Sequence, residues 1–111
     1  MLNAKAKALA LARDYTPPEK PEISLPGRTA LAAMAMAIDG FRLSGKATPH
    51  DVTVGKALAG VLSGGDTDLT ETLGEDDLLG LERRAFVTLA RHPASIARVQ
   101  HMLKTGKPLR N

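Results

Sequence analysis

Basic side chains near the end of the chain are the strongest candidates for chemistry in this sequence. Residues 83–111 contain seven bases and no acid. Four of these side chains could hold phosphates: Arg98, Lys104, Lys107 and Arg110. The region has no aromatic residues interleaved with its bases, which argues against nucleic-acid binding. The small number of bases suits a single phosphorylated ligand better. The sequence therefore predicts a phosphate-binding site that uses Lys104, Lys107 and Arg110.

Acidic side chains are concentrated just before this region. Residues 66–82 contain seven acids and no base. Asp66, Asp68 and Glu71 superficially suggest calcium, but they lack the alternating ligand spacing and mid-loop glycine of a calcium-binding loop. A general acid would need an apolar pocket that raises its pKa, and no apolar segment surrounds these acids. We expect neither a metal site nor a catalytic carboxylate here. The acidic and basic blocks could instead face each other within the fold.

The three histidines, His50, His92 and His101, show no catalytic or metal-binding spacing. No serine–histidine–aspartate arrangement and no pair of histidines four residues apart is present, and the chain has no cysteine. Because Pro93 follows His92, we expect His92 at a junction between two helices, and His101 on an exposed helix face. These patterns predict no catalytic residue and no metal in this chain.

The composition indicates one domain rich in α-helix. Of the 111 residues, 43% are apolar but only 3% are aromatic, so the core must be built from aliphatic side chains that favour helices. The longest apolar run, residues 30–38, is too short to cross a membrane, which takes about 20 residues. The absence of cysteine fits a reducing compartment, and no charged-then-apolar signal segment opens the chain. We therefore expect a cytoplasmic protein without a membrane span.

Proline and glycine divide the chain into five predicted helices. Four prolines forbid helix in residues 16–26: Pro17, Pro18, Pro21 and Pro26. The predicted helices span residues 2–14, 27–43, 48–63, 72–91 and 93–105. We expect an all-α bundle of about five helices. It divides into a first helix (1–15), an extended proline-rich connector (16–26) and a helical core (27–111).

Apolar side chains at helical spacing predict which faces pack together. Residues 30–38 have no polar side chain, so we expect the second helix at the centre, surrounded by others. Gly55 and Gly60 in the third helix suggest close helix contacts. The predicted stripes are Leu2, Ala6, Leu9 and Ala10 in the first helix; Leu31, Met34, Ile38 and Phe41 in the second; Val54, Leu58, Val61 and Leu62 in the third; Leu78, Leu81, Ala85 and Leu89 with Phe86 in the fourth; and Ile96, Val99 and Leu103 in the fifth.

Capping residues predict where the helices begin and end. Thr48 can cap the third helix, where Asp51 would favour the positive helix end. Thr72 and Glu75 have the spacing of a capping box at the start of the fourth helix. Gly106 predicts the end of the fifth helix, because glycine readily adopts the left-handed conformation found there.

Several segments, taken in order, match a known pattern. Residues 81–89 read LERRAFVTL and residues 100–111 read QHMLKTGKPLRN. Upstream, residues 43–45 read LSG before a His-Asp pair, residues 61–66 read VLSGGD, and the first helix runs into YTPP at residues 15–18. Together these segments resemble the C-terminal region of bacterial 3-hydroxyacyl-CoA dehydrogenases fused to an enoyl-CoA hydratase domain. The resemblance covers essentially the whole chain.

This resemblance implies a non-catalytic, helical C-terminal part of a bifunctional fatty-acid β-oxidation enzyme. The family hydrates 2-enoyl-CoA and oxidises 3-hydroxyacyl-CoA with NAD, and its cofactor-binding and catalytic residues match no position here. In crotonase-like relatives the final helices pack on the catalytic core or a neighbouring subunit and help to close over coenzyme A. By this analogy Lys107 lies near the nucleotide end of the ligand, whereas Met102 stands where Phe is often found. The implied partners are the remainder of the enzyme and acyl-CoA.

The residues alone leave a second hypothesis open. The chain could be a free-standing helical interaction module whose basic tail binds an anionic partner. In either case we expect no cofactor within this chain, with NAD belonging to the parent enzyme. The apolar run in residues 30–38 also favours helix-mediated self-association.

Overall fold

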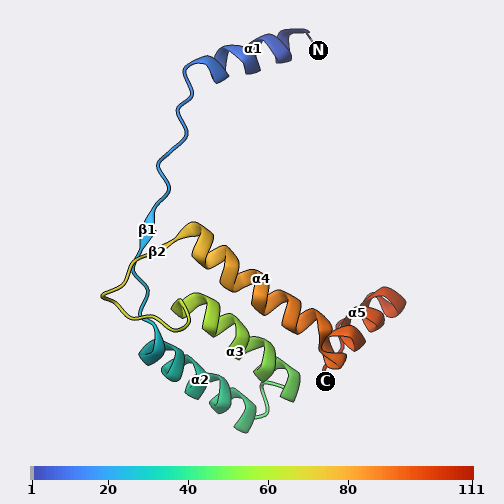
Figure 1. Ribbon diagram of the computed structural model, residues 1–111. Coiled ribbons are helices and arrows are strands. Elements are labelled where there is room, and N and C mark those ends of the chain that lie inside the picture. Colours follow the sequence, from blue (N-terminus) through green and yellow to red (C-terminus); the bar gives the residue numbers. More distant parts are fainter. Residues whose placement is uncertain (1) are drawn as a thin grey trace.

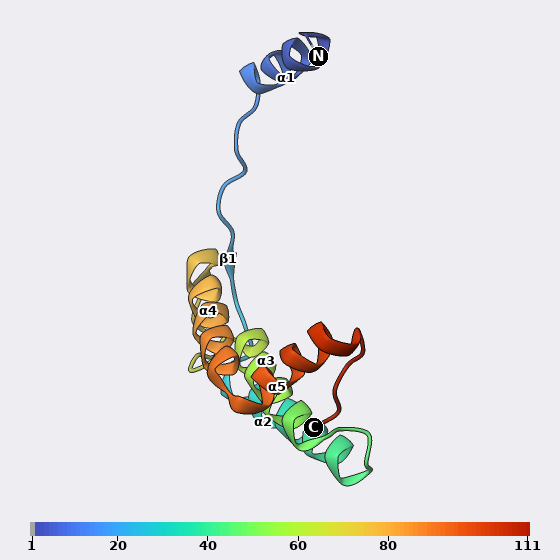
Figure 2. The same ribbon diagram turned by 90° about the vertical axis from the view of Figure 1, so that its right-hand side faces the viewer.

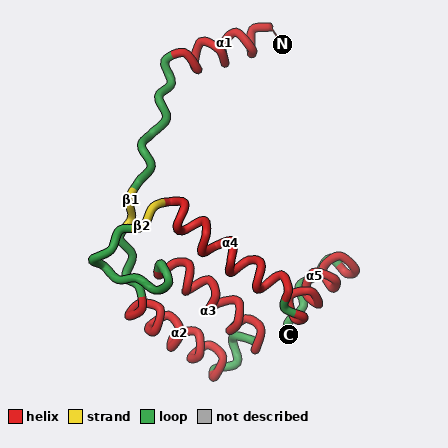
Figure 3. Tube along the Cα trace, in the orientation of Figure 1, coloured by secondary structure: helices red, strands yellow, loops and turns green. Residues whose placement is uncertain are grey.

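The computed structural model describes residues 2–111 and contains five helices and two very short strands (Figure 1). The helices are α1 (Leu2–Arg13), α2 (Arg28–Leu43), α3 (Pro49–Ser63), α4 (Glu75–Arg91) and α5 (Pro93–Thr105). The strands are β1 (Glu22–Ile23) and β2 (Leu73–Gly74). Helix dominates and strand is minimal (Figure 3), so the predicted all-α fold is confirmed.

The first helix stands apart from the others at the end of an extended arm. Residues 15–21 contain no helix or strand, and Figures 1 and 2 both show α1 far from the remaining helices. From Asn3 to Arg13 every side chain of α1 is exposed, so its predicted apolar face is not covered by the described residues; the side chain of Leu2 lies outside them. The arm joins the body where β1 pairs antiparallel with β2, through Glu22 with Gly74 and Ile23 with Leu73.

Three helices lie side by side in one layer, with α3 in the middle (Figure 1). The prediction that α2 is central is wrong, because α2 packs on α3 alone and leaves its other side open. Met36 is 76% exposed and Phe41 is 52% exposed. Most side chains of residues 30–38 are alanine, which fill little volume, so the apolar run does not require neighbours on every side. The remaining helix, α5, leaves the end of α4 in a new direction (Figure 2).

Small side chains, not large ones, make up the contacts of α3. Ala59 is 3% exposed and Ser63 is fully buried, whereas Leu58 and Leu62 are 55% and 56% exposed. The prediction that both leucines are buried is therefore wrong, while Val54 and Val61 are half-buried as expected. Alanine and serine allow the neighbouring helices to approach on both flanks of α3.

The two glycines inside α3 differ in their surroundings. A Cβ added at Gly55 would lie 3.2 Å from Cδ1 of Ile38, so the predicted close helix contact is confirmed there. At Gly60 nothing lies within 4 Å of such a Cβ, and the same prediction is wrong. We expect Gly60→Ala to raise the free energy of unfolding by about 0.5–1 kcal/mol, because alanine loses less backbone entropy in a helix.

Gly55→Ala is the matched control in the same helix. Its entropy gain is offset by crowding against Ile38, so it should stabilise less than Gly60→Ala or destabilise the protein. Urea unfolding of both variants, followed by circular dichroism, measures the difference. Equal effects of the two substitutions would contradict the assigned packing.

Helix α4 begins later than its sequence pattern predicts. The predicted capping box at Thr72 is wrong, because Leu73 and Gly74 pair with β1 and cannot also open a helix. Gly74 is the N-cap, and the Asp77 carboxylate accepts its backbone amide at 2.9 Å. The predicted inward stripe of α4 is half-buried at Leu78, Leu81, Ala85 and Leu89. Phe86 is 68% exposed, so its predicted inward position is wrong.

The last helix carries an uncovered apolar stripe. Ile96, Val99 and Leu103 are 44%, 58% and 83% exposed. The helix ends as predicted at Gly106, whose φ of 69° is left-handed and whose amide donates to the carbonyl of Met102 at 2.8 Å. The half-buried face of α5 contains Ala94, Ala97, Arg98 and His101 instead. Polar contacts rather than the apolar stripe therefore fix α5 to the body.

The chain exposes far more surface than a closed domain of its size. Its radius of gyration is 19.9 Å, whereas a compact domain of this length has about 13 Å. Its accessible surface is 8667 Å², against about 5900 Å² for a folded monomer of 11.7 kDa. Within residues 2–111, no helix combines the length and apolar character needed to span a bilayer. The chain therefore has an open, extended shape.

Candidate functional site

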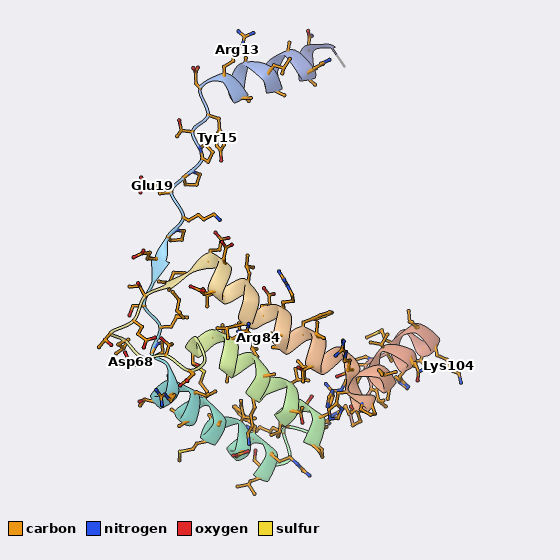
Figure 4. All side chains as sticks on the ribbon, in the orientation of Figure 1. Arg13, Tyr15, Glu19, Asp68, Arg84 and Lys104 are labelled. Carbon is orange, nitrogen blue, oxygen red and sulfur yellow. The ribbon has the colours of Figure 1, made fainter. Side chains whose placement is uncertain are left out.

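The three basic residues predicted to bind phosphate lie at the outer end of the last helix and in the tail that follows. Lys104 is in the final turn of α5, Lys107 follows the capping glycine, and Arg110 lies near the last residue. All three are exposed, and Figure 4 shows Lys104 far from the layer of α2, α3 and α4. None of them forms an ion pair with another residue in the range 2–111. Their charges are available to an external anion, but no element holds them in a fixed cluster.

Arg98, the fourth candidate base, has a different environment. Its Nη2 donates to the Asp51 carboxylate at 2.8 Å and to the Thr48 hydroxyl at 3.2 Å. Its Nε donates to the side-chain oxygen of Asn111 at 2.6 Å. The guanidinium thus joins the start of α3, the middle of α5 and the last residue of the chain. It is used within the fold and is not free for a ligand.

The tail returns to the body and is held there at Asn111. Its side-chain amide donates to the carbonyl of Ala94 at 3.0 Å, and its backbone oxygen accepts the amide of His50 at 3.1 Å. Together with Arg98, these contacts close a loop between α5 and the start of α3. We call this group of residues the C-terminal joint: Thr48, His50, Asp51, His92, Ala94, Ser95, Arg98 and Asn111.

His50 is the most deeply buried titratable group of the C-terminal joint. It is 3% exposed, and its Nε2 lies 2.8 Å from the Ser95 hydroxyl. Its Nδ1 is buried without a hydrogen-bond partner. The ring of His92 lies 4.8 Å away between centroids, tilted by 37°. A hollow of about 170 Å³ lies beside the two rings, between Pro49 and Asn111.

Local sequence explains why these side chains meet. The Thr48 hydroxyl accepts the amide of Asp51 at 3.2 Å and the Asp51 carboxylate accepts the amide of Thr48 at 2.9 Å, so both cap α3. Pro93 is the first residue of α5, and Nδ1 of His92 accepts the amide of Ala94 at 3.1 Å. The predicted cap at Thr48 and the predicted helix junction at His92 are both confirmed. His101, predicted to be exposed, is half-buried.

The charge states of the joint follow from these contacts. The backbone amide of Thr48, followed by the side chains of Arg98 and Thr48, lowers the pKa of Asp51 to about 2. Burial, followed by electrostatic repulsion from Arg98 and from the neighbouring ring of His92, lowers the pKa of His50 below its usual value of 6.5, although Asp51 opposes the shift. Asp51 is therefore a carboxylate and His50 is neutral at pH 7.

The lowered pKa of His50 predicts a loss of stability in mild acid. Below pH 6.5 the unfolded chain binds a proton at this histidine more readily than the folded chain does, so the free energy of unfolding falls as pH drops. Urea unfolding at pH 7.5 and pH 5.5 measures the loss. His50→Gln, which keeps a polar group near Ser95 but cannot titrate, should flatten the dependence. His101→Gln is the control and should retain it; a flat profile in the unmodified chain would contradict the assignment.

The contacts of the C-terminal joint connect the start of α3, the helix α5 and Asn111. The Ser95 hydroxyl lies beside Nε2 of His50, but Nδ1 of His50 has no hydrogen-bond partner, so no carboxylate orients the ring as in a catalytic triad. Among residues 2–111, no group of three or more histidine or acidic side chains could hold a metal ion. Sequence reasoning missed the joint because its contacts join distant residues: Arg98 is 50 positions from Thr48, and Asn111 is 61 positions from His50. The only local signals were the capping residues Thr48 and Asp51 and the helix junction at His92.

The acidic block forms no ion pair with the basic block among residues 2–111. Its ion pairs run to the arm and to α2: Asp76 pairs with Lys20 at 3.3 Å and Asp66 with Arg28 at 2.9 Å. Asp68 instead accepts hydrogen bonds from the hydroxyl of Thr70 and, at 2.7 Å, from its backbone amide, and these bonds lower the pKa of Asp68. Arg84 of the basic block lines a hollow together with Asp66, Asp76 and Asp77. The two blocks thus approach each other at Arg84 but do not pair directly.

An apolar groove runs between α3 and α4, and we call it the α3–α4 groove. Its volume is about 370 Å³. Its walls are Ile23, Leu25, Val61, Leu62, Leu78 and Leu79, and two acids, Glu75 and Glu82, stand at its edge. Leu62 and Leu79 are 56% and 47% exposed, so the groove is open to a partner. Its lining is mostly aliphatic, so its chemical character suits an apolar group.

The described residues do not fit the NAD that the family resemblance implies for the parent enzyme. Dinucleotide-binding domains use a glycine-rich turn between a parallel strand and a helix. The two strands here have two residues each and pair antiparallel, and the sequence contains no Gly-x-Gly-x-x-Gly. No segment of residues 2–111 therefore corresponds to the glycine-rich turn of a dinucleotide-binding domain.

Comparison with known proteins agrees with the segments described above. Over 97 residues, which make up 87% of this chain, the sequence is 41% identical to a probable 3-hydroxyacyl-CoA dehydrogenase of Bacillus subtilis (strain 168). This match shows that the chain is similar to part of a probable 3-hydroxyacyl-CoA dehydrogenase. The chain spans only 12% of the length of that relative. No family model matches the chain, and no solved structure matches it either.

Proposed function

We propose that this chain is the non-catalytic, helical C-terminal part of a bifunctional β-oxidation enzyme. The parent would combine an NAD-dependent 3-hydroxyacyl-CoA dehydrogenase with an enoyl-CoA hydratase. The observation that carries the proposal is the 41% identity over 97 residues to a probable 3-hydroxyacyl-CoA dehydrogenase. Because the match covers 12% of that relative, the groups that would bind NAD and perform the chemistry would lie on the other 88%.

The role proposed for the chain is to pack against the remainder of the enzyme or a neighbouring subunit. Its open surface supports this role, since both α2 and α5 leave large apolar side chains uncovered. Leu43 and Leu103 are 89% and 83% exposed, and Met36 is 76% exposed. A folded monomer rarely exposes so many large apolar groups without a partner. Burying them against a second domain would stabilise both parts.

We also propose that the basic tail contacts the phosphates of coenzyme A through Lys104, Lys107 and Arg110. Their exposure and lack of ion pairs support this contact. The tail is anchored at Asn111, so its path over the body is restricted even though the basic side chains are free. A contact of this kind would be weak, because exposed charges interact through water and are screened by salt.

Nuclear magnetic resonance titration with coenzyme A tests the phosphate contact. Amide shifts of Lys104 and Lys107 should move with coenzyme A, move less with the form lacking the 3′-phosphate, and stay unchanged with pantetheine. Lys104→Ala/Lys107→Ala should abolish the shifts, whereas the control Lys46→Ala, an exposed base beyond α2, should preserve them. Absence of shifts at millimolar coenzyme A would remove the ligand contact from the proposal.

The reading frame around the coding sequence tests the larger proposal. A continuous upstream frame that encodes a strand–turn–helix with Gly-x-Gly-x-x-Gly would support a part of a dehydrogenase. A stop codon directly before Met1 would contradict it and favour a free-standing interaction module. The exposed bases of the tail support this second function. Such a module would bind an anionic partner through Lys104, Lys107 and Arg110.

A further inference from the structure

We propose that α1 of one copy of this chain docks in the α3–α4 groove of a second copy. The inference goes beyond the proposed function and does not rest on it. It starts from the isolation of α1, which has 12 residues and meets none of the other helices (Figures 1 and 2). Helices of about 12 residues are marginal in water without packing partners. A helix at this position therefore requires a surface that covers it.

The side chains of α1 suit an apolar groove. Ala4, Ala8, Leu11 and Ala12 follow helical spacing and form a second apolar stripe, opposite to the predicted face of Leu2, Ala6, Leu9 and Ala10. Lys5 and Lys7 border this stripe on its two sides. Leu11 is 77% exposed, and the alanines are small enough to let the helix approach closely. The α3–α4 groove offers a complementary wall in which leucine dominates.

Charge complementarity selects this groove over the other open faces. Between Leu2 and Arg13, α1 carries three bases, Lys5, Lys7 and Arg13, and no acid. Glu75 and Glu82 stand at the edge of the groove, and within residues 2–111 neither forms an ion pair. The open stripe of α5, by contrast, lies among basic residues, and the hollow beside α2 has a single acid, Asp68. In the hollow lined by Asp66, Asp76 and Asp77, two of the acids already pair with bases and Arg84 adds a positive charge. A basic helix is therefore steered to the α3–α4 groove.

The path of the arm favours a second copy over the same chain. Residues 20–23 are held beside the start of α4 by the β1–β2 pairing and by Lys20 with Asp76. From there the arm leads away from the body, as the labelled residues Glu19, Tyr15 and Arg13 show (Figure 4). Docking in the same chain would require a sharp reversal in a segment stiffened by Pro17, Pro18 and Pro21. Docking on another copy requires none.

The uncovered area is sufficient for such an exchange. Each chain exposes 8667 Å², roughly 2800 Å² more than a compact monomer of its mass, which exposes about 5900 Å². Obligate dimers bury about 2000–5000 Å² summed over both chains, so the excess surface of two chains can supply such an interface. In a reciprocal exchange two α1 helices fill two grooves, so the arrangement closes at two copies. The interface would thus consist of α1 and Leu11 from one chain and of Leu62, Leu79 and Glu82 from the other.

Sedimentation equilibrium of the 111-residue chain gives the first test. The expected mass is twice 11.7 kDa. Leu11→Glu should produce a monomer and cannot unfold the body, because α1 does not contact it. Leu43→Glu is the matched control, since this leucine is 89% exposed at the end of α2, and it should remain dimeric. A monomeric parent chain, or a dimer that survives Leu11→Glu, would overturn the proposal.

Charge reversal and a spin label identify the groove. Glu75→Lys/Glu82→Lys should weaken the dimer at least tenfold, and Lys5→Glu/Lys7→Glu added on the partner should restore it. Because the chain has no cysteine, Asn3→Cys can carry a single nitroxide. Mixed with an untagged, isotope-labelled chain, the label should broaden the amides of Leu62 and Leu79. If the untagged chain showed no broadening, or showed it elsewhere than at the groove, docking between copies in this groove would be refuted. These readouts do not involve coenzyme A, so they can fail while the proposed function stands.

Discussion

Gly27→Ala is expected to lower the free energy of unfolding by about 3–5 kcal/mol, the largest effect of a single substitution in this chain. Gly27 has φ of 70°, in the region that favours glycine. A Cβ at this position would overlap the carbonyl group of Thr67 and come within 2.9 Å of Cα of Asp68. These are backbone atoms, so no side-chain rotation can relieve the overlap.

The position also links three segments. The amide of Gly27 donates to the carbonyl of Ser63 at 2.8 Å, and the amide of Arg28 donates to the carbonyl of Thr67 at 3.2 Å. Any shift that makes room for a methyl group would break these bonds between the start of α2, the end of α3 and the loop that follows. The expected result is loss of the α2–α3 packing, measured by urea unfolding and by hydrogen exchange of α2 amides.

Gly40→Ala is the matched control, because it adds the same methyl group to α2. Nothing lies within 4 Å of a Cβ at Gly40, and its backbone is helical. This variant should be as stable as the unmodified chain or gain up to about 1 kcal/mol. If the two alanine variants had the same stability, the assigned contact between Gly27 and Thr67 would be wrong.

Arg98→Ala is expected to release α5 and the tail from the body, with a loss of about 2–3 kcal/mol. Arg98 donates hydrogen bonds to Asp51, Thr48 and Asn111, and its side chain is 27% exposed. Without the guanidinium, the Asp51 carboxylate loses its partner and Asn111 loses one of its contacts. Hydrogen exchange should show faster opening of α5 while the amides of α2 and α3 remain protected.

Two further variants separate the charge of Arg98 from its geometry. Arg98→Lys keeps the charge but offers a point donor, which cannot bridge Asp51 and Asn111 together, so it should recover only part of the loss. Lys104→Ala removes an exposed base from the same helix and should change stability by less than about 0.5 kcal/mol. If Arg98→Lys were as stable as the unmodified chain, the bridging geometry would not matter.

The helices themselves could be read from the sequence because their signals are local. The capping residue Thr48 and the glycine at position 106 act on neighbouring backbone atoms only, and both predicted helix ends are confirmed. The start of α4 was misjudged because a distant segment intervened: the pairing of β2 with β1 holds Leu73 and Gly74 in strand geometry. No local pattern at Thr72 could reveal that competition.

Burial was harder to predict than helix, since periodicity shows that a face is apolar but not whether anything covers it. Leu58, Leu62 and Phe86 belong to regular apolar patterns and yet remain exposed, because the fold supplies no neighbour for their side of the layer. The candidate phosphate site shows the same limit. The sequence shows the basic residues as a group. It does not show that Arg98 binds Asp51 and Asn111 within the C-terminal joint, because both residues lie far from Arg98 in sequence.

The sequence by itself determined the all-α class, the helix ends set by proline, glycine and capping residues, and the segments that resemble a dehydrogenase family, because each depends on residues close together in the chain. Only the tertiary structure decided that α3 is the central helix, that Arg98 joins α3 to α5, and that the α3–α4 groove stays open. These features arise from contacts between distant segments, and many sequences with the same local patterns could arrange such contacts differently.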